Sequence, residues 1–175
     1  MSIHKRIERQ PPARGAAGFQ ALSGAEWLVG IGFRCWLAGY DTGNIGCWET
    51  GWNAYARALG TERAKRTVTE LACWVRAVRS SASRKIEYYP FDCGLFCRDE
   101  CMAISLIAAS QHHRCPAMRA CALALTGSDL VQPVIDAANA FADAMQEAHQ
   151  LLSPEAVAAL AAGHEASYER PAARR

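Results

Sequence analysis

The strongest constraint on the fold is the spacing of apolar residues, which recurs at steps of three and four along most of the chain. The clearest such seam lies between residues 61 and 80 and consists of Ala64, Val68, Leu71, Val75 and Val78. Steps of three and four place side chains on one face of an α-helix, whereas a half-buried strand alternates at every second residue. The sequence contains no alternating run of strand length. We therefore predict an all-α protein.

The same periodicity, read with the capping residues, predicts six or seven helices joined by short loops. Ser23, Thr61 and Asp92 precede apolar-periodic segments and are of the types that cap helix N-termini. The expected helices cover residues 23–38, 47–59, 61–80, 93–110, 116–127, 133–150 and 153–163. We expect a single-domain irregular bundle over residues 21–168, with a flexible basic tail at 1–20 and a flexible tail at 169–175.

Composition places the chain among packed globular proteins. Hydrophobic residues make up 51% and charged residues 21% of the sequence. No stretch approaches the roughly 20 apolar residues of a membrane-spanning helix. The first residues are basic and include Pro11 and Pro12, which we interpret as a tail and not as a secretion signal. With no export signal, we expect the eight cysteines to be reduced thiols of a cytoplasmic protein.

Charge is unevenly distributed along the chain. Residues 120–169 contain seven acidic residues and no Lys or Arg. The densest basic stretch, Arg57 to Lys85, contains Arg57, Arg63, Lys65, Arg66, Arg76, Arg79, Arg84 and Lys85. Such a split favours either an anionic partner, with nucleic acid as the candidate, or pairing between basic and acidic helices of one bundle.

A group of cysteines and histidines forms a candidate metal site. Three of the cysteines are spaced four apart, which puts them on one broad face of the predicted helix 93–110. Thiolates and imidazoles that converge in a helical core suit Zn(II), Cu(I) or an iron–sulfur cluster. The candidate ligands are Cys93, Cys97, Cys101, His112, His113 and Cys115. Residues 91–125 resemble the cysteine-rich four-helix copper-storage proteins, and this resemblance implies Cu(I). The alternative is that these cysteines are buried core thiols.

The same residues also allow a second interpretation, in which a cysteine is a catalytic nucleophile. Cys93 follows the expected cap Asp92, and a helix N-terminus lowers the pKa of a thiol toward that of a nucleophile. His112 or His113 would then act as the base. The sequence has no glycine-rich phosphate loop, paired His/Glu metal motif or nucleophile elbow. We leave catalysis open and favour a non-enzymatic role.

Tryptophan residues are the candidate interaction residues. Trp36 and Trp74 fall beside the apolar seams of their helices, where they would line a groove or a dimer interface, since tryptophan is enriched at binding hot spots. The alternative is that they widen the core. The four candidates are Trp36, Trp48, Trp52 and Trp74. The tryptophan-rich stretch 39–59, which includes Trp48-Glu49-Thr50-Gly51-Trp52, resembles the ribosome modulation factor family, and this resemblance implies a nucleic-acid partner.

The sequence as a whole favours a helical interaction protein with a regulatory role. It would act by docking a protein partner or by self-association into a homo-oligomer. The first alternative is a helical protein that binds metal through cysteine and histidine. The second is a nucleic-acid-binding regulator that uses residues 57–85. No membrane partner is expected.

Overall fold

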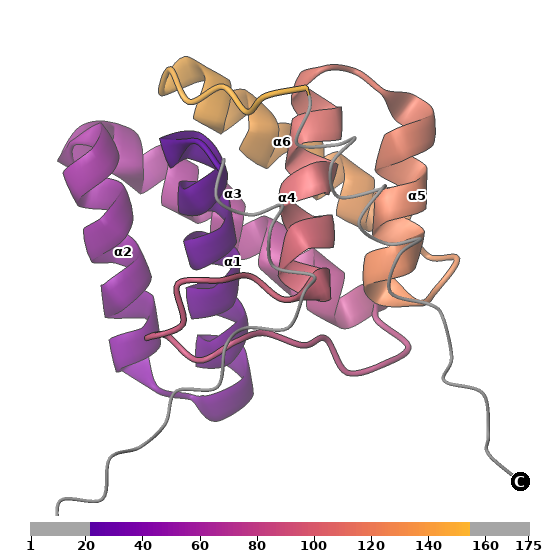
Figure 1. Ribbon diagram of the computed structural model, residues 1–175, viewed down its shortest axis with the longest axis horizontal. Coiled ribbons are helices and arrows are strands. Elements are labelled where there is room, and N and C mark those ends of the chain that lie inside the picture. Colours follow the sequence, from indigo (N-terminus) through magenta and orange to yellow (C-terminus); the bar gives the residue numbers. More distant parts are fainter. Residues whose placement is uncertain (1–21, 155–175) are drawn as a thin grey trace, which may run out of the picture.

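A computed structural model of the protein describes residues 22–154 and contains six helices within that range. They are α1 (Gly24–Thr42), α2 (Ile45–Leu59), α3 (Thr61–Ser81), α4 (Arg98–Gln111), α5 (Cys115–Thr126) and α6 (Gln132–Glu147). The predicted all-α bundle is confirmed for this part of the chain (Figure 1). The seventh helix expected at 153–163 lies almost entirely outside the described residues, as do both predicted tails.

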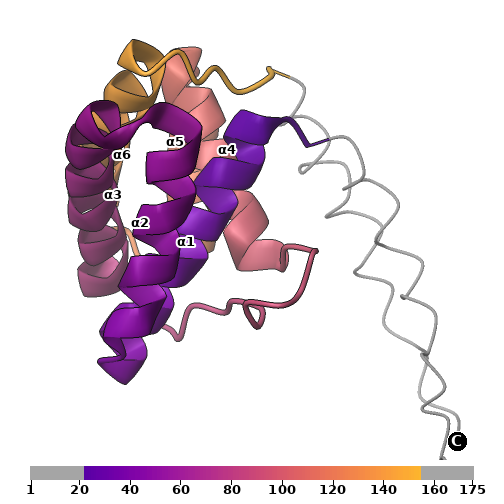
Figure 2. The same ribbon diagram turned by 90° about the vertical axis from the view of Figure 1, so that its left-hand side faces the viewer.

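The helices form two groups of three that pack side by side (Figures 1 and 2). In the first group, α2 packs against α1 and α3; in the second, α4 packs against α5 and α6. The groups meet where α1 contacts α4 and where α3 contacts α6. Every residue of α4 from Asp99 to Gln111 is buried, so this helix lies in the interior of the bundle.

Two glycines shape the end of α1 and its contact with α2. Gly43 takes a left-handed conformation with φ of 68°, and its N–H caps α1 by donating to the Gly39 carbonyl. The sequence predicts that this helix ends at residue 38, but its cap is Gly43, so Gly39 lies inside the helix. A Cβ on Gly39 would lie only 2.3 Å from the indole nitrogen of Trp48, so glycine here lets α2 pack closely on α1.

Aromatic side chains form the centre of the contact between the two groups. Trp74 of α3 is fully buried between Phe33 of α1 and Phe141 of α6. Its ring is stacked on Phe141 at 5.4 Å between centroids and is tilted against Phe33 at the same separation. Such pairs stabilise a core by about 0.5–1.5 kcal/mol beyond the effect of buried area.

The prediction of a helix from residue 93 is wrong, because α4 begins five residues later at Arg98. A helix over this stretch would need the Cys93 carbonyl to accept a bond from the Cys97 N–H. Instead, the Cys93 carbonyl accepts a bond from the Arg34 side chain, and the Cys97 N–H donates to the Glu100 carboxylate. The 16 residues 82–97, here called the strap, consequently contain neither helix nor strand.

The chain after α6 folds back on the start of α1 and the end of α4. Gln111 donates from its side-chain amide to the Gln150 carbonyl and accepts from the Leu152 N–H, each at 2.9 Å. The carboxylate of Glu26, which is buried, accepts bonds from both the N–H and the hydroxyl of Ser153. Three polar side chains thus connect the end of the described chain to the bundle.

Candidate binding surface

The strap is the longest connection between helices in the described chain, and it crosses the bundle. It leaves α3, runs over α1 as far as the flank of α2, turns, and returns to the first residue of α4 (Figures 1 and 2). Loops of more than about 12–15 residues are uncommon in compact domains and are frequently functional. What holds the strap in place, and what it presents to solvent, therefore bear on function.

A single buried arginine holds the strap against α1. Arg34 is 1% exposed, and its guanidinium donates to three strap carbonyls, those of Pro90 at 3.1 Å, Cys93 at 2.8 Å and Leu95 at 2.6 Å. The remaining donors engage the carboxylate of Glu100 at 2.6 and 3.2 Å, and this residue is fully buried. All five guanidinium donors are thus used.

Phe96 forms the apolar part of the same clasp. Its ring lies under the Arg34 guanidinium, 5.0 Å from centroid to charged carbon. It also lies on Gly30, one helical turn before Arg34, where an added Cβ would come within 2.5 Å of the ring. Glycine at position 30 therefore makes room for the strap's aromatic anchor. We call Gly30, Arg34, Phe96 and Glu100 the clasp.

A second ion pair holds the beginning of the strap. Arg84 donates to both oxygens of Asp99 at 2.7 Å each and to the Ala124 carbonyl at 2.9 Å. Asp99 also accepts the N–H of Glu87 at 2.9 Å. This bidentate pairing fixes the outgoing arm of the strap to α4 and α5, as the clasp fixes the returning arm to α1.

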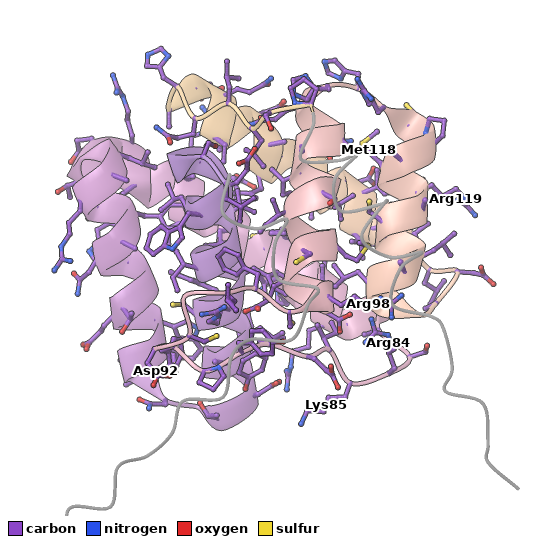
Figure 3. The ribbon with its side chains drawn as sticks, in the orientation of Figure 1. Arg84, Lys85, Asp92, Arg98, Met118 and Arg119 are labelled. Carbon is purple, nitrogen blue, oxygen red and sulfur yellow. The ribbon has the colours of Figure 1, made fainter. Side chains whose placement is uncertain are left out.

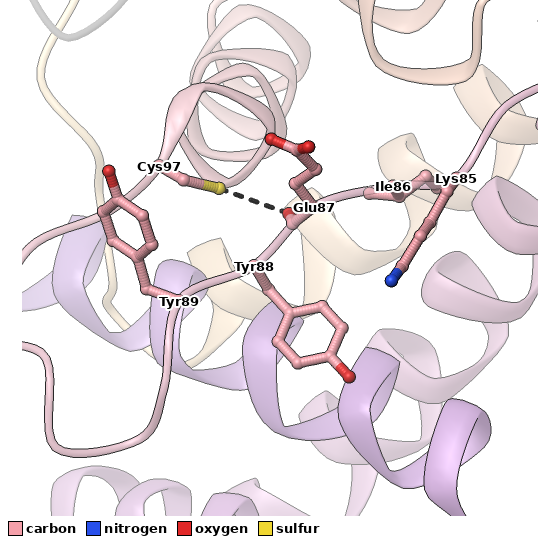
Figure 4. Close-up of a pocket in the computed structure, with 6 residues that line it drawn as sticks. All are labelled: Lys85, Ile86, Glu87, Tyr88, Tyr89 and Cys97. Atoms are coloured by element: carbon pink, nitrogen blue, oxygen red, sulfur yellow. Dashed lines mark hydrogen bonds between the residues drawn. The ribbon is translucent and has the colours of Figure 1, made fainter.

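Between its two fixed arms the strap presents aromatic side chains to solvent. Tyr89 is 42% exposed and Phe91 is 44% exposed. Tyr88 and Tyr89 lie on opposite sides of the extended backbone, beside a cavity of about 400 Å³ lined by residues 85–89 and Cys97 (Figure 4). Large aromatic side chains exposed on a fixed loop are typical of a binding surface, because rigid loops lose little conformational entropy when a partner binds.

The structure separates the six candidate metal ligands into two groups. Cys93 lies in the strap, and Cys97 and Cys101 lie at the start of α4. The other three candidates, His112, His113 and Cys115, lie beyond its end, roughly 20 Å away for a 14-residue helix. Among residues 22–154, no group of three or more His, Cys, Asp or Glu is arranged to hold a metal ion.

The thiols of the strap region are poor nucleophiles in this structure. Burial raises the pKa of Cys97 to about 11, and its sulfur donates to the Glu87 carbonyl at 3.2 Å. Burial likewise raises the pKa of Cys101 well above its ordinary value. Cys93, the candidate nucleophile, is not at a helix N-terminus, because α4 begins five residues after it. All eight cysteines of the chain are free.

The four candidate tryptophans differ in exposure. Trp74 is fully buried in the aromatic core, and Trp36 is buried against Gly51 of α2. Trp48 is half-buried and packs edge-on to Tyr40 with centroids 5.8 Å apart, and Trp52 is half-buried on α2. Trp48 and Trp52 therefore keep some surface for a partner, whereas Trp74 keeps none.

Much of the basic stretch 57–85 is paired with acidic groups of the same domain. Arg66 of α3 pairs with Glu147 of α6, which joins the basic helix to an acidic one. The other pairs are Lys65–Glu62, Arg79–Asp41 and Arg84–Asp99. The structure thus shows basic and acidic side chains paired within the domain, which is one of the two interpretations of the charge asymmetry. No helix in the described range is long and apolar enough to cross a membrane.

The clasp was not predicted from the sequence, although it leaves a signal there. Arg34 is the only charged residue between Trp27 and Tyr40, in the middle of an apolar run. A charge buried in such a run must be paired and hydrogen-bonded, because desolvation is otherwise prohibitive. Glu100 is likewise a charged residue beside a long apolar run, the one that forms α4. What the sequence does not show is that the two residues meet, since 66 positions separate them.

Comparisons with protein-family models, with curated proteins and with solved structures found no match to this chain. The two resemblances noted in the sequence stay expectations.

Proposed function

We propose that this chain is a non-enzymatic helical interaction protein with a regulatory role, which docks a protein partner through the strap. The observation that carries the proposal is the use of all five Arg34 donors, three of them on strap carbonyls, to fix a loop that exposes Tyr89 and Phe91. A buried ion pair is a costly way to hold a loop. Such a cost fits a loop whose shape matters for recognition.

The exposed aromatic residues supply the chemistry of recognition. Tyrosine combines a large apolar surface with a hydrogen-bonding tip, and aromatic residues are enriched in the cores of protein interfaces. Lys85, Glu87 and Asp92 are exposed around them and provide a charged rim. This arrangement of an aromatic centre and a polar rim is typical of protein–protein interfaces.

The state of the cysteines supports a cytoplasmic location for this function. All eight are free thiols, and burial raises the pKa of Cys35 to about 12 and that of Cys121 to about 11. Free thiols in this number suit a reducing compartment. Nucleic acid is the less supported partner, because four basic side chains of the 57–85 stretch pair with acids within the domain.

Position-specific crosslinking tests the proposal. A photoreactive amino acid is placed at position 89 or 91 of the full chain, and in a control at the exposed Arg119 of α5, away from the strap (Figure 3). We expect a defined protein adduct from positions 89 and 91 and none from 119. The adduct protein is then purified, and its affinity is measured for the wild type and for Tyr89→Ala/Phe91→Ala.

The double variant should weaken binding at least about tenfold while its unfolding midpoint changes little, because both side chains are exposed on the surface. Equal adducts at all three positions would contradict the proposal, and so would unchanged affinity in the double variant.

A further inference from the structure

We infer that the partner of the strap is the strap of a second copy of this chain, paired antiparallel about a twofold axis. This inference rests on the proposed function and adds the identity of the partner. A twofold interface brings the same patch of both copies together, so the patch must be complementary to itself. The strap meets this requirement in the sum of its charges and in where they lie.

The exposed charged residues of the strap and of the first position of α4 balance to zero. Lys85 and Arg98 are positive, and Glu87 and Asp92 are negative; all four are exposed. Arg84 does not enter this sum, because Asp99 holds it through two hydrogen bonds. A surface with no net charge does not repel its own copy.

Net charge is also separated along the strap. Asp92 lies at the far turn, beside α2, whereas Lys85 and Arg98 lie at the opposite end near the start of α4 (Figure 3). Glu87, whose N–H donates to Asp99 of α4, also lies at this end and leaves it with a net charge of +1. The aromatic residues Tyr89 and Phe91 come between them in the sequence. When a second strap is laid across the first in the opposite direction, each acidic turn faces a basic end. The exposed rings of Tyr89 and Phe91 are then covered by the second copy, which removes them from water.

The size of the patch sets the strength of the association. Stable interfaces bury about 800 Å² on each partner and involve about 20–30 residues a side, whereas the strap has 16 residues. A dimer of this kind belongs to the weak class, with a dissociation constant in the micromolar range, and it weakens as salt screens the paired charges. Reversible self-association suits a regulatory role better than a permanent dimer.

Charge reversal in the full chain tests the pairing by sedimentation equilibrium at low salt. Asp92→Lys alone places like charges opposite each other twice per dimer, and so does Lys85→Asp alone. Each should raise the dissociation constant at least about tenfold. When the two variants are mixed in equal amounts, both contacts of the mixed dimer become attractive. The mixture should therefore recover an affinity within about threefold of the wild type.

Arg119→Asp, an exposed charge reversal on α5, is the matched control and should leave the dissociation constant unchanged. A wild-type chain that stays monomeric at every concentration would overturn the inference, and so would mixed variants that form no mixed dimer. The crosslinking experiment separates the two proposals. A position-specific adduct with a different protein would uphold partner binding through the strap and overturn pairing between copies, whereas an adduct of twice the chain's mass would support both.

Discussion

Two places in this bundle hold neighbouring segments together by different kinds of contact. Where the strap crosses α1, the contact is centred on a buried ion pair: Arg34 and Glu100 are 1% and 0% exposed. Where α3 meets α6, the centre is apolar, and the ion pair Arg66–Glu147 lies outside it with both side chains more than half exposed. Apolar packing stabilises without regard to direction, whereas the clasp specifies one backbone path. The difference shows that an irregular loop can be given one defined path by buried polar contacts, without a helical seam.

Arg34→Met should have the largest effect, a loss of about 3–5 kcal/mol in the free energy of unfolding. It removes five hydrogen bonds and leaves the Glu100 carboxylate buried without its cation. Urea unfolding measures the loss, and limited proteolysis shows whether cleavage begins in the strap. Arg34→Lys is the control, because it keeps the charge but cannot reach the same set of acceptors. A loss below about 1 kcal/mol for Arg34→Met would contradict the importance of the clasp.

Trp74→Ala probes the apolar side of the comparison and should cost about 3 kcal/mol, the lower end of the usual range for Trp→Ala. The loss is moderated because the buried Trp74 ring N–H has no hydrogen-bond acceptor, and its removal relieves that penalty. The strap should keep its resistance to proteolysis in the folded protein, since Trp74 packs between α1 and α6. Strap cleavage as fast as in Arg34→Met would show that the two regions do not act independently.

The sequence predicts one of these regions much better than the other. The seam that includes Leu71, Val75 and Val78 predicts α3 to within one residue, because helical periodicity is a local property. The clasp depends on contacts between α1, the strap and the start of α4, and no local pattern reports a contact across 66 positions. The Arg34 side chain donates to strap carbonyls from Pro90 onward, so these carbonyls do not accept helical hydrogen bonds. This explains why the predicted helix over 93–110 begins too early. Exposure of Tyr89 and Phe91 is likewise set by the path of the strap and not by its composition.

Substitution of Glu26 should have a smaller effect on stability, and one that depends on pH. The Glu26 carboxylate joins the start of α1 to the chain after α6. Burial acts to raise the pKa of Glu26, but hydrogen bonds from Ser153 and Ser23 outweigh it and hold the pKa below its ordinary value of 4.5. A carboxyl with a lowered folded-state pKa stabilises the protein above its unfolded-state pKa, and this contribution is lost as the pH falls through the folded-state value. Glu26→Gln should therefore cost about 1–2 kcal/mol at pH 7 and progressively less below pH 4.5. Urea midpoints of both proteins between pH 7 and about pH 3 test this, and a constant difference would contradict it.

The surface pair Arg66–Glu147 should give the smallest effect, which sharpens the contrast with the clasp. Both side chains are solvated in the folded protein, so their attraction is screened and offset by the entropy lost in holding them together. A double-mutant cycle with Arg66→Met and Glu147→Met should return a coupling below about 0.5 kcal/mol, falling toward zero at about 1 M salt. The matching cycle with Arg34→Met and Glu100→Met should return a coupling of several kcal/mol that salt leaves unchanged, because a buried pair is poorly screened. Equal couplings in the two cycles would mean that burial does not distinguish these ion pairs, and the clasp would then no longer explain why the strap holds one path.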